Sequence, residues 1–130
     1  MELTITTKQP KQVIAITNLI NKQLEKEKTK NGLCFLFIKH TTACLTTADL
    51  DPGTDLDMLD AFAALMPQLP YRHPHNPKHV TDHILSSIIG ASLVIPIKNG
   101  ELDLGTWQEV VLIELDGPKE RTVTFTSLVL

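Results

Sequence analysis

The chain has 130 residues, which is enough for one ordinary domain with its own hydrophobic core, and we expect a single domain over residues 1–130. Hydrophobic residues make up 42% and charged residues 21%, a balance that is typical of globular proteins and excludes disordered and fibrous classes. The net charge of −3, with no basic cluster outside a stretch at 22–30 that also carries glutamates, argues against nucleic acid as a partner.

The first ten residues lack a charged segment followed by an apolar one, and no apolar run is long enough to span a bilayer. We therefore expect a cytoplasmic protein with no membrane contact. Cys34 and Cys44 lie among apolar residues and lack CxxC spacing, which favours reduced structural thiols over a disulfide or a zinc site.

The first half of the chain predicts a strand, a helix and a second strand region. Residues 3–7 alternate and are rich in β-branched side chains, which favours a strand. From Pro10 to the Asn-Gly pair at 31–32, apolar residues recur at helical spacing. These are Val13, Ile16, Leu19, Ile20 and Leu24. The segment 33–48 favours strand but becomes polar at 39–42, where a core strand would stay apolar.

Two further helices and a series of strands follow. After a Pro-Gly turn, an apolar stripe predicts a helix up to Met66 with Thr54 as N-cap, and a short third helix over 82–90 ends at Gly90. The C-terminal part predicts consecutive strands joined by tight turns, at 92–97, 105–115 and 121–130. We therefore predict an α+β fold: a largely antiparallel sheet or sandwich, with two main helices and a short third helix packed on one side.

The segment 70–90 holds four of the five histidines. They are His73, His75, His79 and His83. The positive end of a helix disfavours imidazolium, so His83 near a helix start is expected to be neutral, the form that binds a metal. If the helix reaches back to Pro77 with Asn76 as N-cap, His79 and His83 share one helix face. The alternative for His73, His75 and His79 is an exposed polar loop, which we expect for at least two of them.

The remaining candidates each have a structural alternative. His40 stands where the strand region turns polar and could simply cap a strand end. The acidic run around Asp57 fits a helix start, and it lacks the DxDxDG pattern of a calcium site. Trp107 is more typical of a core than of a site, whereas Glu114 at the end of an apolar strand is either exposed at an edge or paired, and a paired carboxylate is a candidate base or metal ligand.

Four stretches together resemble the YjbQ-like family, also called the secondary thiamine-phosphate synthase family. They are HTTACLTT at 40–47, HILSSIIGASLVIPI at 83–97, GELDLGTWQEVVLIELDGP at 100–118, and Arg121. The ordered set is specific, and the resemblance runs from Leu3 to Phe125. One departure is at 47–51, TADLD, which is one residue shorter than the Asn-Glu-Asn-like run of many members and points to a subgroup with a different substrate.

The resemblance implies an α+β homotrimer with a polar cleft near a subunit boundary, and a weak coupling of a hydroxymethylpyrimidine pyrophosphate with a thiazole phosphate. The positions that match family residues are His40, Thr41, Asp51, Pro52, Asp57, His73, His83, Gly105, Trp107, Gln108, Glu114 and Arg121. His75 and His79 match no family position.

Three hypotheses follow from the residues and the resemblance together. The leading one is an enzyme acting on a phosphorylated small molecule, with His40, His83, Asp57 and Glu114 as catalytic residues. Substrate contacts are then expected from Thr41, Trp107, Gln108 and Arg121. A divalent metal, zinc or a similar ion, would be held by His40, His73 and His83, because imidazoles are its preferred ligands. The alternatives are a non-catalytic metal- or anion-binding module and a structural trimer.

Overall fold

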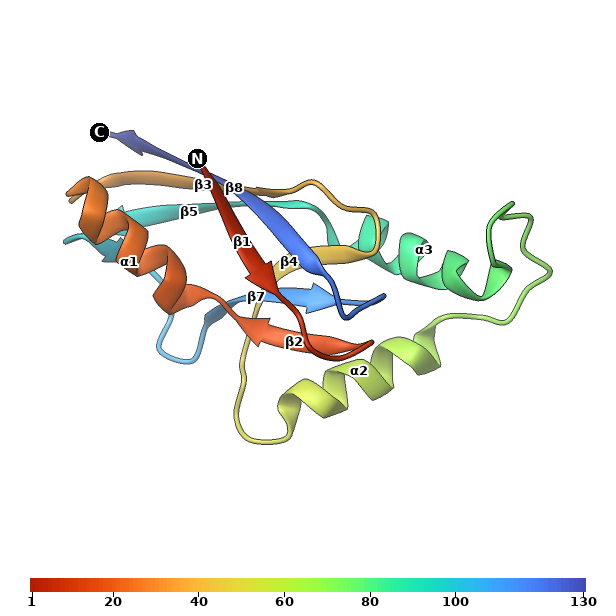
Figure 1. The fold of residues 1–130 in the computed structure, drawn as a ribbon. Coiled ribbons are helices and arrows are strands. Elements are labelled where there is room, and N and C mark those ends of the chain that lie inside the picture. The colour runs from red at the N-terminus through yellow and green to blue at the C-terminus, as the bar shows by residue number, and fades with distance from the viewer.

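The computed structural model describes residues 1–130 and contains two antiparallel sheets and three α-helices (Figure 1). The strands are β1 (Glu2–Thr6), β2 (Gln12–Ala15), β3 (Gly32–Ile38), β4 (Ala43–Ala48), β5 (Ser92–Lys98), β6 (Glu101–Leu102), β7 (Glu109–Glu114) and β8 (Glu120–Val129). The helices are α1 (Thr17–Glu27), α2 (Thr54–Leu65), the 3₁₀ turn η1 (Pro77–His79) and α3 (Val80–Ile89). The α+β prediction is confirmed.

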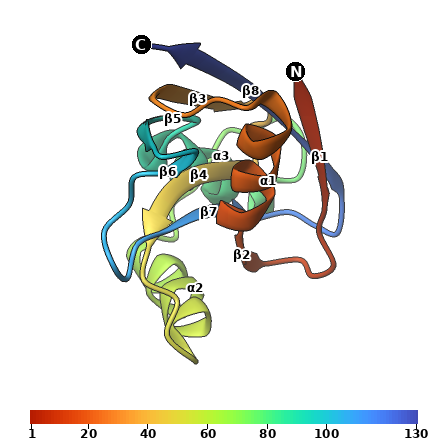
Figure 2. The same cartoon turned by 90° about the vertical axis from the view of Figure 1, so that its left-hand side faces the viewer.

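The two sheets pack face to face as a sandwich. The larger sheet has the order β1-β8-β3-β5-β6, and the smaller has the order β2-β7-β4. Alternate residues of the larger sheet, such as Leu36 and Phe125, point inward and meet Leu45 and Leu112 of the smaller sheet in the main core. Helix α1 closes one end of this core through Ile20, where it contacts β6 and β7 (Figure 2).

The other face of the smaller sheet is covered by α2 and α3. Val111 and Ile113 of β7 pack there against Leu85 of α3 and Phe62 of α2. Strand β7 is therefore buried on both faces, which accounts for its continuous apolar run instead of an alternating pattern. Glu114 ends this strand and is the one charged residue in its fully buried part.

The first helix is shorter than the sequence predicts. Residues Gln12–Ala15 form β2 and pair with β7, with Val13 opposite Ile113. The helix begins at Thr17 and ends at Glu27, and Lys28 after it has a left-handed φ of 57°. The helical prediction for 12–15 was wrong because pairing with a buried strand overrides a local apolar spacing that both structures can use. The prediction that all helices gather on one side was also wrong, since α1 lies apart from α2 and α3 (Figure 1).

Two strand regions cross between the sheets instead of continuing. The segment 33–48 leaves the larger sheet after Ile38 and enters the smaller one at Ala43. The C-terminal strands are not one meander either, because β7 lies in the smaller sheet and β8 returns to the larger one between β1 and β3. The polar residues at 39–42 thus form a crossing. Together with the turn at 115–119, they lie at one end of the sandwich.

Of the two helix N-caps predicted from the sequence, the structure has one and lacks the other. The Asn76 side chain accepts a hydrogen bond from the Lys78 N–H at 3.2 Å, and Pro77 opens the η1 turn that leads into α3, so the predicted cap is confirmed. Thr54 lies in the first turn of α2 instead of capping it, and the cap position is Gly53. None of the helices is long and apolar enough to cross a membrane.

Candidate functional site

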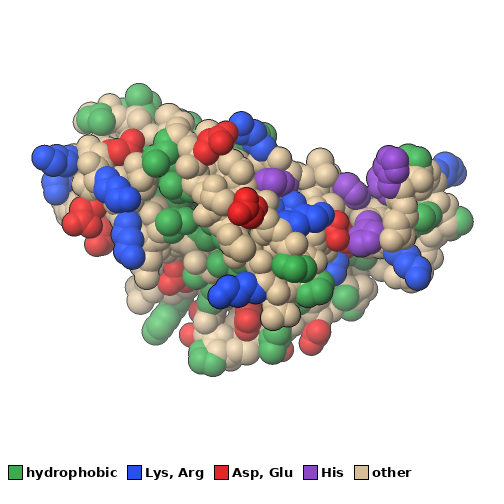
Figure 3. Space-filling model, viewed as in Figure 1, with side chains coloured by type: hydrophobic (Ala, Val, Ile, Leu, Met, Phe, Trp, Pro, Cys, Tyr) green, Lys and Arg blue, Asp and Glu red, His purple; other side chains and the backbone are tan.

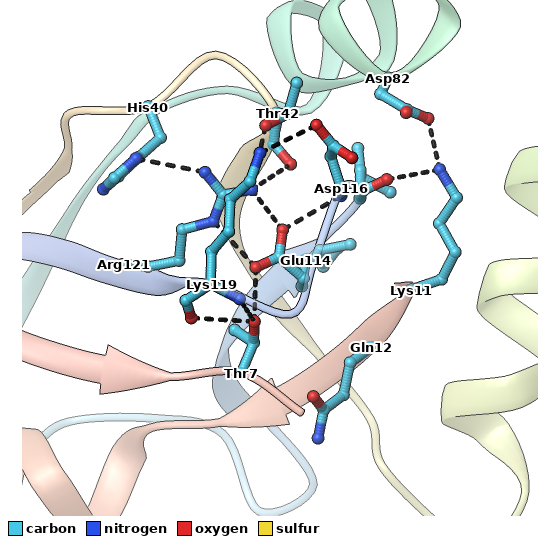
Figure 4. Close-up of polar contacts among 12 residues, drawn as sticks. Thr7, Lys11, Gln12, His40, Thr42, Asp82, Glu114, Asp116, Lys119 and Arg121 are labelled. Atoms are coloured by element: carbon cyan, nitrogen blue, oxygen red, sulfur yellow. Dashed lines mark hydrogen bonds and ion pairs between the residues drawn. The ribbon is translucent and has the colours of Figure 1, made fainter. Parts of the chain in front are cut away.

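A buried ion pair joins the two sheets where the chain crosses between them. Glu114 is the last residue of β7, and Arg121 is the second residue of β8. The Arg121 Nε donates to Glu114 Oε1 at 2.9 Å, and Nη2 donates to Oε2 (Figure 4). The two side chains are 3% and 0% exposed, so this is a two-point pair closed to solvent.

Further hydrogen bonds complete the pair on both sides. Arg121 Nη2 also donates to the Thr42 carbonyl at 3.2 Å and to its hydroxyl at 3.0 Å. Glu114 accepts from the Thr7 hydroxyl at 2.7 Å and from the Asp116 N–H at 3.1 Å. Burial by itself would raise the pKa of Glu114, but the hydrogen bonds from Arg121, Thr7 and Asp116 hold it below 4.5. The Glu114 side chain therefore stays ionised and holds Arg121 in place, and it is a poor proton acceptor.

His40 is held at the outer side of Arg121. Its Nε2 lies 2.9 Å from the Thr122 backbone N–H, and its Nδ1 lies 3.2 Å from Arg121 Nη1. Burial, followed by the nearby charge of Arg121, lowers the pKa of His40 from 6.5, which favours the neutral ring near pH 7. A neutral imidazole has one nitrogen lone pair in the ring plane, and two donors already face its nitrogens. No lone pair is left for a metal in this geometry.

A polar cleft of about 430 Å³ opens beside this network. Its lining contains no hydrophobic side chain and consists of Lys39, His40, Thr41, Thr42, His83, Asp116, Lys119 and Arg121. Three of these carry a positive charge and one a negative charge. The volume is within the range of small-molecule sites, roughly 300–1,000 Å³. In Figure 3, one histidine lies beside Lys and Arg atoms near the middle of the face, and the others gather over the start of α3.

His83 reaches the same cleft from the first turns of α3. The structure therefore brings His40 and His83 together. The ring of His83 lies against the ring of His73, with a distance of 4.8 Å between the ring centroids and an angle of 48° between the ring planes. Apart from the backbone hydrogen bonds of the helix, His83 accepts one from Ser87 Oγ at 3.0 Å, and it does so through its backbone carbonyl. The ring nitrogens of His83 are therefore available to a ligand.

A second cluster lies at the rim of the cleft and consists of His79, Asp82 and Asp116. The His79 Nδ1 is 3.4 Å from one oxygen of each carboxylate. Lys11 Nζ lies 2.5 Å from the other oxygen of Asp82, and Lys119 Nζ lies 2.9 Å from the other oxygen of Asp116 (Figure 4). Burial by itself would raise the pKa of Asp116, but the hydrogen bond and charge of Lys119, with smaller effects from His79 and Arg121, hold it below 3.8.

Several residues proposed from the sequence lie outside the cleft. Gln108 donates to the Thr47 hydroxyl at 3.1 Å, and Trp107 beside it is 73% exposed. Both precede the first residue of β7, whereas Glu114 is its last residue, so they lie at the opposite end of the strand. Asp57 is exposed on the first turn of α2 and does not line the cleft. Within one chain, these three residues do not meet His40.

The proposed metal ligands also do not converge. One group of three side chains in the chain offers ligand atoms within 4.8 Å of one another, and it is His79, Asp82 and Asp116. His73 and His83 are neighbours, but His40 has both ring nitrogens engaged. The trio of His40, His73 and His83 therefore does not fit a metal ion as the chain is folded here, and we derive no chemical step from a metal held there.

Sequence reasoning missed several residues of the two clusters. Lys39 and Thr42 line the cleft and lie within two residues of the predicted His40. The polar interruption of the strand region at 39–42 was the sequence signal that could have identified them. Asp116 and Lys119 flank the Gly-Pro turn after Glu114. Thr7 and Lys11, by contrast, lie in the segment between β1 and β2, and the approach of Thr7 to Glu114 and of Lys11 to Asp82 has no local sequence signal.

Known proteins match this chain over almost its whole length. The family model described as "UPF0047 protein YjbQ-like" matches residues 1–129. The chain belongs to the YjbQ/UPF0047 family. A UPF0047 protein of Archaeoglobus fulgidus is 32% identical over 129 residues, covering 98% of this chain and 100% of that protein. The UPF0047 protein YugU of Bacillus subtilis is 34% identical over 121 residues, covering 92% of each.

Solved structures of similar proteins share the fold closely. A hypothetical protein of Aeropyrum pernix is 33% identical with a TM-score of 0.91, covering 100% of this chain and 98% of that one. A YbjQ-like protein of unknown function from Sulfolobus solfataricus is 30% identical with a TM-score of 0.91, covering 100% and 96%. The resemblance found in the sequence motifs is thereby confirmed. These comparisons establish the YjbQ/UPF0047 family, and the reaction has to be inferred from the geometry of the cleft.

Proposed function

We propose that this chain is a small-molecule enzyme of phosphate or pyrophosphate chemistry that works in the cleft between His40 and His83. The observation that carries the proposal is the lining, which has three cationic side chains, one carboxylate and no hydrophobic residue. Such a surface favours a small anion with several oxygens over an apolar ligand. The family resemblance suggests the same class, a coupling of a pyrimidine pyrophosphate with a thiazole phosphate.

The side chains divide into binding groups and proton carriers. Lys39 and Lys119 are half-exposed and can turn toward a phosphate, while Arg121 contributes its charge from a fixed position. A leaving pyrophosphate gains negative charge at the bond that breaks, so nearby cations lower the barrier. His83 has ring nitrogens free to donate or accept a proton, whereas neutral His40 can accept one only when its Nε2 leaves the Thr122 N–H.

The test is to replace His40 and His83 singly by Ala and to measure the coupling of the two thiamine precursors. We expect both variants to lose activity by roughly 10²-fold or more, which is the usual loss for a proton-transferring group. The exposed His75 provides a matched His→Ala control with wild-type activity. Wild-type rates in both cleft variants, with folding intact by circular dichroism, would contradict the proposal.

A second candidate is a non-catalytic module that binds an anion. It is favoured by the hydrogen bonding of Arg121, whose Nε and Nη2 are already used by Glu114 and Thr42. An arginine held in this way acts as a fixed charge more than as a ligand clamp. This alternative predicts tight calorimetric binding of pyrophosphate, weakened in Lys119→Met, together with turnover too slow to matter. A fast reaction with a natural substrate would exclude it.

We further propose that the chain forms the homotrimer implied by the resemblance, through the outer face of the larger sheet. Phe35 and Phe37 of β3 are 39% and 49% exposed there, and Val94 and Leu128 on the neighbouring strands are 57% and 50% exposed. A contiguous exposed apolar patch is typical of an interaction surface. A neighbouring copy is also the route by which the exposed Trp107 could contact substrate, because within one chain it lies away from the cleft.

A further inference from the structure

We propose that His79, Asp82 and Asp116 form a binding site for one divalent metal ion, zinc or a similar transition metal, at the rim of the cleft. The three residues come from two places in the fold: His79 and Asp82 lie three positions apart where η1 leads into α3, and Asp116 lies in the turn after β7. The site is separate from the His40, His73 and His83 trio and does not depend on the proposed reaction.

Two of the three distances between the ligand atoms match those of a metal site. The His79 Nδ1 lies 3.4 Å from Asp82 Oδ2 and 3.4 Å from Asp116 Oδ1, and all three atoms lie within 4.8 Å of one another. In a tetrahedral zinc site with bonds of about 2.0–2.1 Å, neighbouring ligand atoms are about 3.3–3.4 Å apart. An ion can therefore sit among the three atoms with small adjustments of the side chains.

A hydrogen bond from His79 is the alternative explanation for this arrangement, and the distances do not favour it. At 3.4 Å, neither carboxylate oxygen is within the usual N–H to O range of about 2.7–3.2 Å. The Nδ1 atom is buried and has no hydrogen-bond partner. A buried polar atom without a partner costs free energy, and here it points at two carboxylates. A cation among the three atoms would satisfy all of them.

The two carboxylates are already oriented for the ion by lysines. Lys11 holds Oδ1 of Asp82, which leaves Oδ2 toward His79, and Lys119 holds Oδ2 of Asp116, which leaves Oδ1 toward His79. Lys11 is fixed in turn by the Leu115 carbonyl at 2.5 Å. Partners of this kind, which bond to the ligands and not to the ion, fix ligand orientation in metal sites. Asp82 is also 93% buried, so it cannot turn freely to another partner.

The donor set indicates the class of ion. One imidazole nitrogen and two carboxylate oxygens suit zinc, manganese or ferrous iron better than calcium, which takes oxygen ligands alone. Three protein ligands leave a fourth position open, as in zinc sites that bind water or a substrate oxygen. Because Asp116 lines the cleft, an ion bound to it would lie next to an anion held there.

The test uses the full chain, freed of metal by a chelator, and titrates Zn²⁺ by calorimetry and Co²⁺ by its visible absorption. We expect one ion per chain and a cobalt spectrum of low coordination number. Asp82→Asn and His79→Ala should each weaken binding by at least roughly 10–100-fold, the loss seen even when an outer partner of a metal site is removed. His79 is 42% exposed, so His79→Ala leaves a folded protein should Asp82→Asn fail to fold.

Two matched variants make the result specific. His75→Ala removes an exposed histidine of the same loop, and His83→Ala removes a histidine of the cleft; both should bind Zn²⁺ as the wild type does. Absence of binding in the wild-type chain would overturn the proposal. So would a loss in His83→Ala equal to that in His79→Ala, because the ion would then belong to the cleft histidines. Neither readout requires enzymatic activity.

Discussion

Glu114 and Arg121 join the two sheets of the sandwich through an ion pair that is closed to solvent. Glu114 belongs to the three-stranded sheet and Arg121 to the five-stranded sheet, and seven positions of chain separate them. Arg121 also positions His40 and Thr42, so the pair links the stability of the fold to the geometry of the cleft. Changes to this pair should therefore appear in the folding free energy as well as in ligand binding.

Arg121→Met should lower the free energy of unfolding by about 3–5 kcal/mol, because it leaves the buried Glu114 carboxylate without its cation. Urea denaturation followed by circular dichroism measures this loss. The double variant Glu114→Gln/Arg121→Met should lose clearly less than the sum of the two single variants, since no charge is then left buried. Additive losses would contradict the coupling.

The pair should also make the fold sensitive to acid. The pKa of Glu114 is lower in the folded chain than the ordinary value of 4.5, so its stabilising effect is full above that pH and is lost as the pH falls through the folded pKa. The melting temperature of the Glu114→Gln variant should therefore fall less steeply than that of the wild type below about pH 4.5. Glu120→Gln, on the exposed side of the same strand region, should follow the wild-type slope.

His40 should titrate below 6.5 in the folded chain, because burial and then the charge of Arg121 disfavour its imidazolium form. Ring proton shifts in NMR spectra measure this pKa directly. Lys119→Met removes a smaller contribution of the same sign and should move the His40 pKa upward, whereas Lys98→Met on β5 should leave it unchanged. A His40 pKa above 6.5 in the wild type would rule out the neutral base.

Replacing Phe35 and Phe37 together by Thr should convert the proposed homotrimer into monomers, because it removes aromatic area from the centre of the exposed patch. Threonine keeps the preference for strand, so the fold should persist. Light scattering coupled to gel filtration gives the molar mass. Ile88→Thr is the matched control, since Ile88 is 70% exposed on α3, away from the sheet. A wild-type chain that is monomeric at high concentration would contradict the interface.

Gly117→Ala should destabilise the fold by about 1–3 kcal/mol, the usual effect of overpacking. A Cβ at this position would lie 2.4 Å from the Gln9 carbonyl oxygen and 2.8 Å from Glu114 Cγ, so the turn next to the ion pair would have to move. Gly105→Ala is the control, because its added Cβ would meet the Gln108 side chain at 3.4 Å. Equal thermal stability of the two variants would contradict this account.

Features encoded within a few residues could be predicted from the sequence by itself. The Asn76 cap with Pro77, the end of α3 at Gly90 and the turn at 99–100 follow from local backbone preferences. The ordered motifs from position 40 to 121 identified the family, and the mixture of helices and strands gave the fold class. The helical prediction for 12–15 failed because an apolar pair next to a helix can equally belong to a strand.

Only the tertiary structure decided which distant side chains meet. The strand β7 joins the smaller sheet and β8 the larger one, and this crossing brings Glu114 against Arg121 and His40. The same end of the sandwich places His79, which matched no family motif, against Asp116. These contacts depend on which strands pair and where the chain crosses between sheets. That choice is made by burial of the whole core, and no local pattern encodes it.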